Sequence, residues 1–161
     1  MGDHSGGYVL APRDGEHFGF LGTLATVKAG DAQTGGAFTL IEQVAPPGFR
    51  PPPHVHEAED EAFYVLAGIL RVTCDGQRWD AAPGAFVFLP RGVPHAFEVV
   101  SPEPARLLQL TVPARFEQFV AEVGERLSEP SLPEPTPPDV PRLLAAMAKH
   151  GYAPAAPPAG S

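Results

Sequence analysis

Residues 48–68 read GFRPPPHVHEAEDEAFYVLAG, a proline-rich loop that leads into two histidines, an acidic turn and an apolar run. Side chains two positions apart on an extended chain point the same way, so His54 and His56 are predicted to share one face. Glu61 lies five residues after His56 and would face away on an unbroken strand. We therefore expect residues 57–60 to form a turn, after which Glu61 opens the next strand and faces the histidines.

A second segment, residues 84–95, reads GAFVFLPRGVPH. Its apolar part, Ala85–Leu89, has no polar face and predicts a strand buried on both sides. A Pro/Gly turn follows this strand, and His95 begins the returning strand. Three imidazoles and one carboxylate suit a first-row transition metal that keeps positions open for water, substrate or dioxygen. Such a centre keeps a net positive charge, which favours an anionic oxygen donor such as an enolate or phenolate.

Each of these motifs taken alone has a simpler interpretation. A His-x-His pair is common without a metal, and single histidines usually serve packing or surface roles. The acidic residues can form a solvated turn, and Glu57, Glu59 and Asp60 are alternatives to Glu61 as the carboxylate. The metal hypothesis depends on both segments contributing to one site.

Short apolar runs separated by Gly and Pro turns extend from about Tyr8 to Val112, which is typical of a β-sandwich or barrel. Asp75-Gly76 lies between two alternating runs and predicts a type I′ hairpin. The expected strands are Gly19–Lys28, Phe38–Val44, Glu61–Leu66, Ile69–Cys74, Ala85–Leu89, His95–Val100 and Leu107–Val112.

After Pro113 the apolar residues recur at helical spacing from Phe116 to Leu127, and Pro113 suits the first turn of such a helix. A second helix is predicted from its N-cap Asp139 to His150, with Gly151 beyond its end. We expect one domain, with three parts in chain order: a barrel at 1–112, a helix packed on it at 113–128, and a Pro-rich linker, short helix and frayed tail at 129–161.

The chain has 161 residues and a formal net charge of −8, which disfavours nucleic acid and anionic membranes as partners. Cys74 is the single cysteine, so no intrachain disulfide can form. The first residues lack the pattern of a signal peptide, and a cytoplasmic location is expected.

Taken together, the two segments resemble the cupin superfamily. The first cupin motif, G-x5-H-x-H-x4-E-x6-G, is matched by Gly48, His54, His56, Glu61 and Gly68. The second, G-x5-P-x-G-x2-H-x3-N, is matched by Gly84, Pro90, Gly92 and His95. Val99 replaces the last Asn, which is not a metal ligand in the family, so this departure leaves the predicted site intact.

A narrower likeness, over roughly residues 8–152, is to bacterial single-cupin proteins of the quercetin 2,3-dioxygenase group. The resemblance implies an all-β fold, a jelly-roll β-barrel, followed here by two C-terminal helices. It also implies one divalent transition metal (Fe, Ni, Co, Mn, Cu or Zn), no organic cofactor, and four ligands: His54, His56, Glu61 and His95.

In the enzymes of that group the metal binds a deprotonated 3-hydroxyflavone, and dioxygen attacks the activated ring with release of carbon monoxide. The resemblance therefore implies a small-molecule substrate and O2 as partners, with Glu61 as both ligand and general base. Several apolar side chains are expected to line the substrate pocket, although they can equally be core residues: Phe38, Leu40, Phe63, Val65 and Phe97.

Two other functions fit the same residues. The first is a metal-dependent cyclase or isomerase of a polyketide or small carbonyl compound, which consumes no dioxygen. The second is a non-catalytic cupin that binds a small ligand, although such a protein has no need of four intact ligands. Cupins commonly pair through their barrel faces, so a homodimer is expected.

Overall fold

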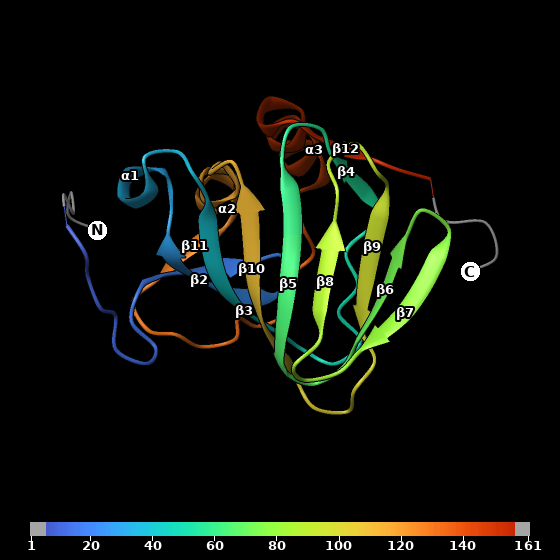
Figure 1. The fold of residues 1–161 in the computed structure, drawn as a ribbon, viewed down its shortest axis with the longest axis horizontal. Coiled ribbons are helices and arrows are strands. Elements are labelled where there is room, and N and C mark those ends of the chain that lie inside the picture. Colours follow the sequence, from blue (N-terminus) through green and yellow to red (C-terminus); the bar gives the residue numbers. More distant parts are fainter. Residues whose placement is uncertain (1–5, 157–161) are drawn as a thin grey trace.

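The structure is a computed structural model that describes residues 6–156. Its strands form two antiparallel sheets that face each other (Figure 1). The seven-stranded sheet has the order β11 (Glu125–Leu127), β1 (Glu16–Phe20), β2 (Thr23–Ala29), β3 (Thr39–Ala45), β10 (Ala105–Val112), β5 (Asp60–Ala67) and β8 (Phe86–Leu89). The five-stranded sheet has the order β12 (Tyr152–Pro154), β4 (His54–His56), β9 (His95–Val99), β6 (Leu70–Cys74) and β7 (Gln77–Ala81).

The predicted all-β jelly roll with C-terminal helices is confirmed, but the sheets are not closed into one hydrogen-bonded barrel. Within residues 6–156 no strand pairing joins the two sheets. They are held together instead by a cluster of buried side chains between them, which includes Phe63, Leu70, Phe97 and Leu107. Burial of apolar surface, rather than a continuous ladder of hydrogen bonds, therefore closes the structure.

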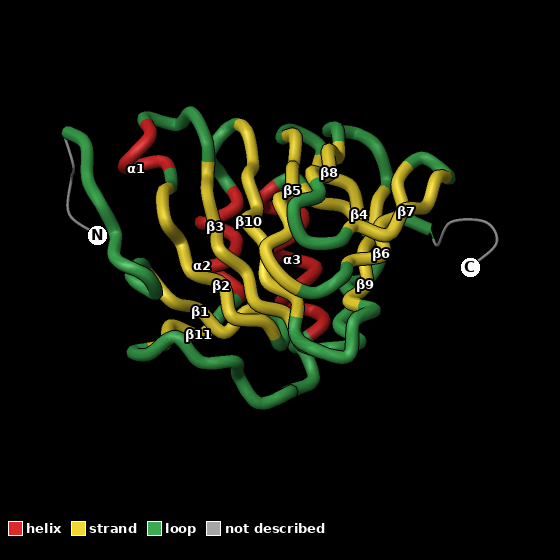
Figure 2. Tube along the Cα trace, turned by 60° about the horizontal axis from the view of Figure 1, so that its bottom comes forward, coloured by secondary structure: helices red, strands yellow, loops and turns green. Residues whose placement is uncertain are grey.

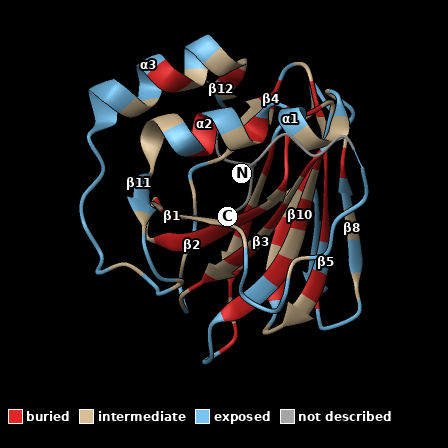
Figure 3. Ribbon diagram, turned by 90° about the vertical axis from the view of Figure 1, so that its left-hand side faces the viewer, coloured by how far each residue is buried: buried red, intermediate tan, exposed pale blue. Residues whose placement is uncertain are grey.

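Helices α2 (Phe116–Val123) and α3 (Val140–His150) lie side by side over the part of the large sheet that the small sheet leaves uncovered (Figure 3). A second buried cluster joins them to β1, β2 and β3, and it includes Phe20, Phe119 and Val120. Phe20 and Phe119 meet edge to face at 5.5 Å. The helices are thus part of the folded unit and complete its core.

Several predicted elements are confirmed. Asp75 and Gly76 have φ of 49° and 73°, as a type I′ turn requires, and they join β6 to β7. Helix α3 begins at its N-cap Asp139, whose side chain accepts a hydrogen bond from the Arg142 backbone N–H at 3.1 Å. It ends at Gly151, which has a left-handed φ of 80°.

The predicted strand Gly19–Lys28 is wrong as one element, because it spans two strands. Leu21 and Gly22 have φ of 52° and 84°, and they turn the chain between β1 and β2. Two consecutive residues with positive φ make a tight hairpin, and Gly22 marks it in the sequence. Phe20 before the turn and Leu24 after it are both buried apolar residues, so hydrophobicity alone did not reveal the break.

The prediction that Ala85–Leu89 is buried on both faces is also wrong. The side chains alternate on β8: Leu89 is 1% exposed, while Phe86 is 67% and Phe88 56% exposed. Strand β8 lies at the edge of the large sheet, and no helix of the described residues covers the outer face of that sheet. Apolar character on both sides of a strand therefore does not imply burial of both sides.

The C-terminal third differs from the prediction at three points. Helix α2 begins at Phe116, after Pro113, and ends at Val123 instead of Leu127. A Cβ at Gly124 would lie 2.7 Å from the Val120 carbonyl oxygen, so the chain leaves the helix where only glycine fits. The next residues pair with β1 as β11, and the expected frayed tail forms β12 from residue 152 to 154, while residues 157–161 lie outside the described part.

The expected Pro-rich linker is present, since residues 128–139 contain no helix or strand and run along one edge of the molecule (Figure 2). A short helix that the sequence did not predict, α1 (Asp31–Thr34), links β2 to β3. No helix in the described part of the chain is long and apolar enough to cross a membrane.

We predict that Phe119→Ala lowers the free energy of unfolding by about 3–5 kcal/mol, because this side chain fills the core beneath α2. Leu144→Ala is the control, since Leu144 is 46% exposed on α3, and a change within about 0.5 kcal/mol is expected. Urea unfolding measures both. A loss below about 1 kcal/mol for Phe119→Ala would contradict the role of α2 in the core.

Candidate metal centre

The four predicted ligands come from both sheets. His54 and His56 lie on β4, and His95 begins β9 directly opposite His54. Glu61 is the second residue of β5, in the other sheet. Their potential ligand atoms all lie within 4.8 Å of one another. The structure therefore brings all four predicted residues to one point between the sheets.

The unusual spacing between His56 and Glu61 has a structural reason. Residues 57–59 carry the chain from β4 in the small sheet to β5 in the large sheet. Glu61 therefore faces the histidines across the sandwich. Arg91, in the loop before β9, anchors this crossing, because its backbone N–H and its guanidinium both donate to the Asp60 carboxylate at 2.9 and 2.8 Å.

Backbone carbonyls orient two of the three imidazoles. The Nδ1 atom of His54 lies 2.9 Å from the Pro52 carbonyl oxygen, and that of His95 lies 3.0 Å from the Val93 carbonyl oxygen. A carbonyl oxygen only accepts, so each Nδ1 carries the proton and donates it. The neutral ring then has a bare Nε2 lone pair, which is the form that binds a metal.

The third imidazole is oriented by a carboxylate. The Nδ1 atom of His56 lies 3.0 Å from Oε1 of Glu59, and the Tyr152 hydroxyl donates to the same oxygen at 2.7 Å. Glu59 is 1% exposed. Burial and the nearby Glu59 carboxylate raise the pKa of Tyr152 far above its ordinary value, so the phenol stays a donor.

The Nε2 atoms of His95 and His56 converge on the Glu61 carboxylate. Its Oε2 atom lies 3.1 Å from Nε2 of His95 and 3.8 Å from Nε2 of His56. Nε2 of His95 is buried and has no hydrogen-bond partner among the described residues. Lone pairs that face a carboxylate in a buried site repel one another unless a cation lies between them. The residues present therefore fit a bound metal ion.

The surroundings set the charge of these groups. Burial lowers the pKa of His54 to about 4, so this ring is neutral at pH 7. Burial alone would raise the pKa of Glu61, but the imidazoles of His56 and His95 outweigh it and lower the pKa to about 2. For His56, burial by itself would lower the pKa. The nearby carboxylates of Glu61 and Glu59 outweigh burial, so the pKa of His56 is raised.

One further residue holds the carboxylate in place. Gln109, on β10, donates from its side-chain amide to Oε1 of Glu61, and it is 5% exposed. The sequence analysis missed this residue. A signal was present, because Gln109 interrupts the alternation of Ala105–Val112 as a polar side chain on the inward face. Glu59 was weighed only as an alternative ligand, whereas it binds the far side of the His56 ring.

The five predicted pocket residues lie in different places. Phe63 and Phe97 meet at 5.3 Å, each two positions along its strand from Glu61 or His95, and belong with Val65 to the core below the ligands. Leu40 lies on the face of β3 opposite to the buried Ile41, and Phe38 precedes β3 and is 36% exposed. These last two therefore lie away from the four ligands.

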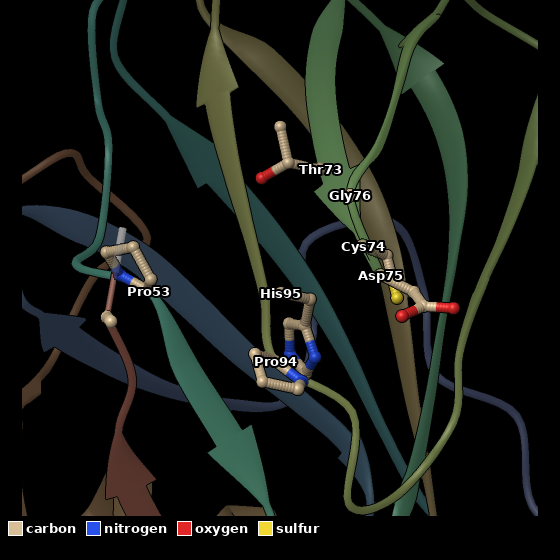
Figure 4. A pocket seen from close by; sticks show the side chains of 8 residues that line it. Pro53, Thr73, Cys74, Asp75, Gly76, Pro94 and His95 are labelled. Carbon is tan, nitrogen blue, oxygen red and sulfur yellow. The ribbon is translucent and has the colours of Figure 1, made fainter. Parts of the chain in front are cut away.

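A surface pocket of about 320 Å³ borders the centre at His95 (Figure 4). It opens between the β6–β7 turn, the loop before β9 and the C-terminal segment. None of the five predicted pocket residues lines it. Its lining consists of Pro53, Thr73, Cys74, Asp75, Gly76, Pro94, His95 and Ala156.

We predict that the purified chain binds one Co²⁺ or Zn²⁺ ion and that His95→Ala abolishes this binding. A metal concentration 100 times the dissociation constant should stabilise the wild type by about 2.7 kcal/mol. Metal analysis after dialysis and thermal unfolding measure the two effects. The matched control is His17→Ala, which removes a histidine of β1 outside the site. Equal metal content in His95→Ala and wild type would contradict the site.

Comparison with known proteins agrees with this geometry. A family model described as a cupin domain matches residues 41–112. Quercetin 2,3-dioxygenase from Bacillus subtilis is 30% identical over 118 residues, which are 73% of this chain and 35% of that protein. An uncharacterized protein from Methanocaldococcus jannaschii is 27% identical over 75 residues, 47% of this chain and 60% of that one. The chain thus spans about a third and three-fifths of the lengths of these relatives.

Solved structures show the same fold. KdgF from Halomonas sp. superposes with a TM-score of 0.61 at 19% identity, over 71% of this chain and 99% of that chain. An RmlC-like cupin from Shewanella frigidimarina gives a TM-score of 0.59 at 18% identity, over 72% and 98%. The match over residues 41–112 identifies a cupin domain in this chain, and the solved structures show the same cupin fold.

Proposed function

We propose that this cupin is a metal-dependent dioxygenase that cleaves a flavonol-like or other enolisable aromatic substrate with O2. The observation that carries the proposal is the convergence of three imidazoles and one carboxylate on one point between the sheets. The 30% identity to a quercetin 2,3-dioxygenase supports this choice among cupin activities. The substrate class is a proposal, since one fold hosts many chemistries.

A metal would be held by His54, His56, Glu61 and His95, and it would supply polarisation of a coordinated hydroxyl and a lower pKa for that group. Glu61 is buried among the imidazoles of the site, so we assign it a second role as acceptor of the substrate's hydroxyl proton. Gln109 keeps this carboxylate turned toward the imidazoles through its hydrogen bond to Oε1.

The substrate approaches, in this proposal, through the pocket that borders His95. Its volume of about 320 Å³ lies at the lower end of the range for small-molecule sites. Proline and alanine side chains supply apolar contact there, and Phe63 and Phe97 close the space beneath the ligands. A flat aromatic ring suits such walls better than a strongly charged ligand does.

We predict that chain loaded with Fe²⁺, Mn²⁺, Co²⁺ or Ni²⁺ bleaches the absorbance band of quercetin and takes up one O2 per molecule consumed. Glu61→Gln should lower the rate by more than the 10–100-fold that changes around metal ligands typically cause, because it removes a ligand and the proposed base. Glu57→Gln, an exposed residue of the same turn, is the control. An unchanged band with all four metals would refute the proposal.

A metal-dependent isomerase is the second candidate. A sugar phosphate isomerase of the cupin superfamily from Silicibacter pomeroyi matches with a TM-score of 0.50 at 26% identity, over 58% of this chain and 61% of that chain. A metal ion held by the same ligands would polarise a carbonyl, and the reaction would consume no dioxygen. An oxygen electrode distinguishes the two, because turnover without O2 uptake favours the isomerase.

A further inference from the structure

Glu59 and Tyr152 lie behind the metal-facing side of His56. We propose that these two residues position His56 for the metal. The C-terminal strand β12, which carries Tyr152, would then contribute directly to the geometry of the metal centre. This inference rests on the metal site of the proposed function and goes beyond it, since neither residue is a ligand. Tyr152 also lies outside the cupin-domain match at residues 41–112.

The hydrogen bonds of the pair are directed at one nitrogen. His56 donates from Nδ1 to Oε1 of Glu59 at 3.0 Å, and the Tyr152 hydroxyl donates to that same oxygen at 2.7 Å. The Tyr152 ring lies 4.7 Å from the His56 ring, and the Phe116 ring stacks on the His56 ring at 6.0 Å and 17°. The imidazole is therefore held by a hydrogen bond at its edge and by aromatic rings against its faces.

Packing of the fold alone does not explain a carboxylate at position 59. Its Oε2 atom is buried and has no hydrogen-bond partner among the described residues, which makes the carboxylate a costly choice for packing alone. A carboxylate that accepts from a ligating histidine fixes the ring and makes the opposite nitrogen a stronger donor to the metal. His54 and His95 have only backbone carbonyls in this place. His56 is thus the one ligand histidine of this site that has a carboxylate behind it.

The tertiary structure brings Tyr152 to this point through α3. Gly151 ends the helix and reverses the chain, and its carbonyl accepts from the Glu57 backbone N–H at 2.9 Å. Tyr152 then pairs with His56 across β12 and β4. On its other side Tyr152 packs against Phe119 of α2 at 4.8 Å. The two C-terminal helices therefore set the position of the Tyr152 hydroxyl.

The test uses Glu59→Ala, Glu59→Gln and Tyr152→Phe in the full chain. We expect Glu59→Ala to weaken Co²⁺ and Zn²⁺ binding by about 10–100-fold, and Tyr152→Phe by less, because it leaves the Glu59–His56 bond intact. Glu59→Gln keeps an acceptor without the charge and should restore part of the affinity. Matched controls are Glu57→Ala in the same turn and Tyr64→Phe on the exposed face of β5, which should bind as wild type does.

Two further measurements separate positioning from stability. At a pH where the His56 ring of the metal-free protein is neutral, ¹⁵N spectra should show its proton on Nδ1, and Glu59→Ala should give a mixture of tautomers. The Co²⁺ absorption spectrum should shift in Glu59→Ala relative to wild type. Variants that melt earlier yet keep the wild-type metal affinity, cobalt spectrum and tautomer would overturn the inference.

The outcomes also separate this inference from the proposed function. A wild-type chain that binds Co²⁺ tightly but neither bleaches quercetin nor takes up O2 refutes the dioxygenase and leaves the inference standing if Glu59→Ala weakens binding. A chain that consumes quercetin while Glu59→Ala binds metal as wild type does refutes the inference alone.

Discussion

Three imidazole nitrogens and a carboxylate aimed at one buried point are the constraint around which this structure is organised. The Nδ1 atoms face the carbonyls of Pro52 and Val93 and the carboxylate of Glu59, which leaves the Nε2 atoms directed at Glu61. Such an arrangement repels itself in a buried site and is relieved by a cation. The surrounding elements hold these groups together against that repulsion.

Two packing units hold the site from opposite directions. The core between the sheets places Phe63 and Phe97 below the ligands. The core under α2 and α3 places Phe116 and Tyr152 beside His56. The site therefore lies where the sandwich and the helical layer meet, and both must be packed for the ligand rings to be rigid.

Much of the fold and the ligand set could be predicted from local sequence. Three signals lie within a few residues of the ligands that they predict: the His54-x-His56 spacing, the turn before Glu61 and the Pro/Gly turn before His95. The Asp75-Gly76 hairpin and the cap at Asp139 are equally local. The wrongly predicted elements depended on neighbours. Phe86 and Phe88 of β8 are exposed because no helix within residues 6–156 covers that sheet face, and residues 125–127 form a strand because they pair with the edge of β1.

The sequence by itself determined which side chains can bind a metal, since their spacing places them on the same faces of short strands. Only the tertiary structure decided which residues hydrogen-bond to the ligands, or to the residues that orient the ligands. Gln109 reaches Glu61 from a strand 48 residues away, and Tyr152 reaches Glu59 from 93 residues away. The physical reason is that strand pairing and helix packing set these contacts. A local pattern can mark Gln109 as a polar residue on an inward face, but it does not identify Glu61 as its partner.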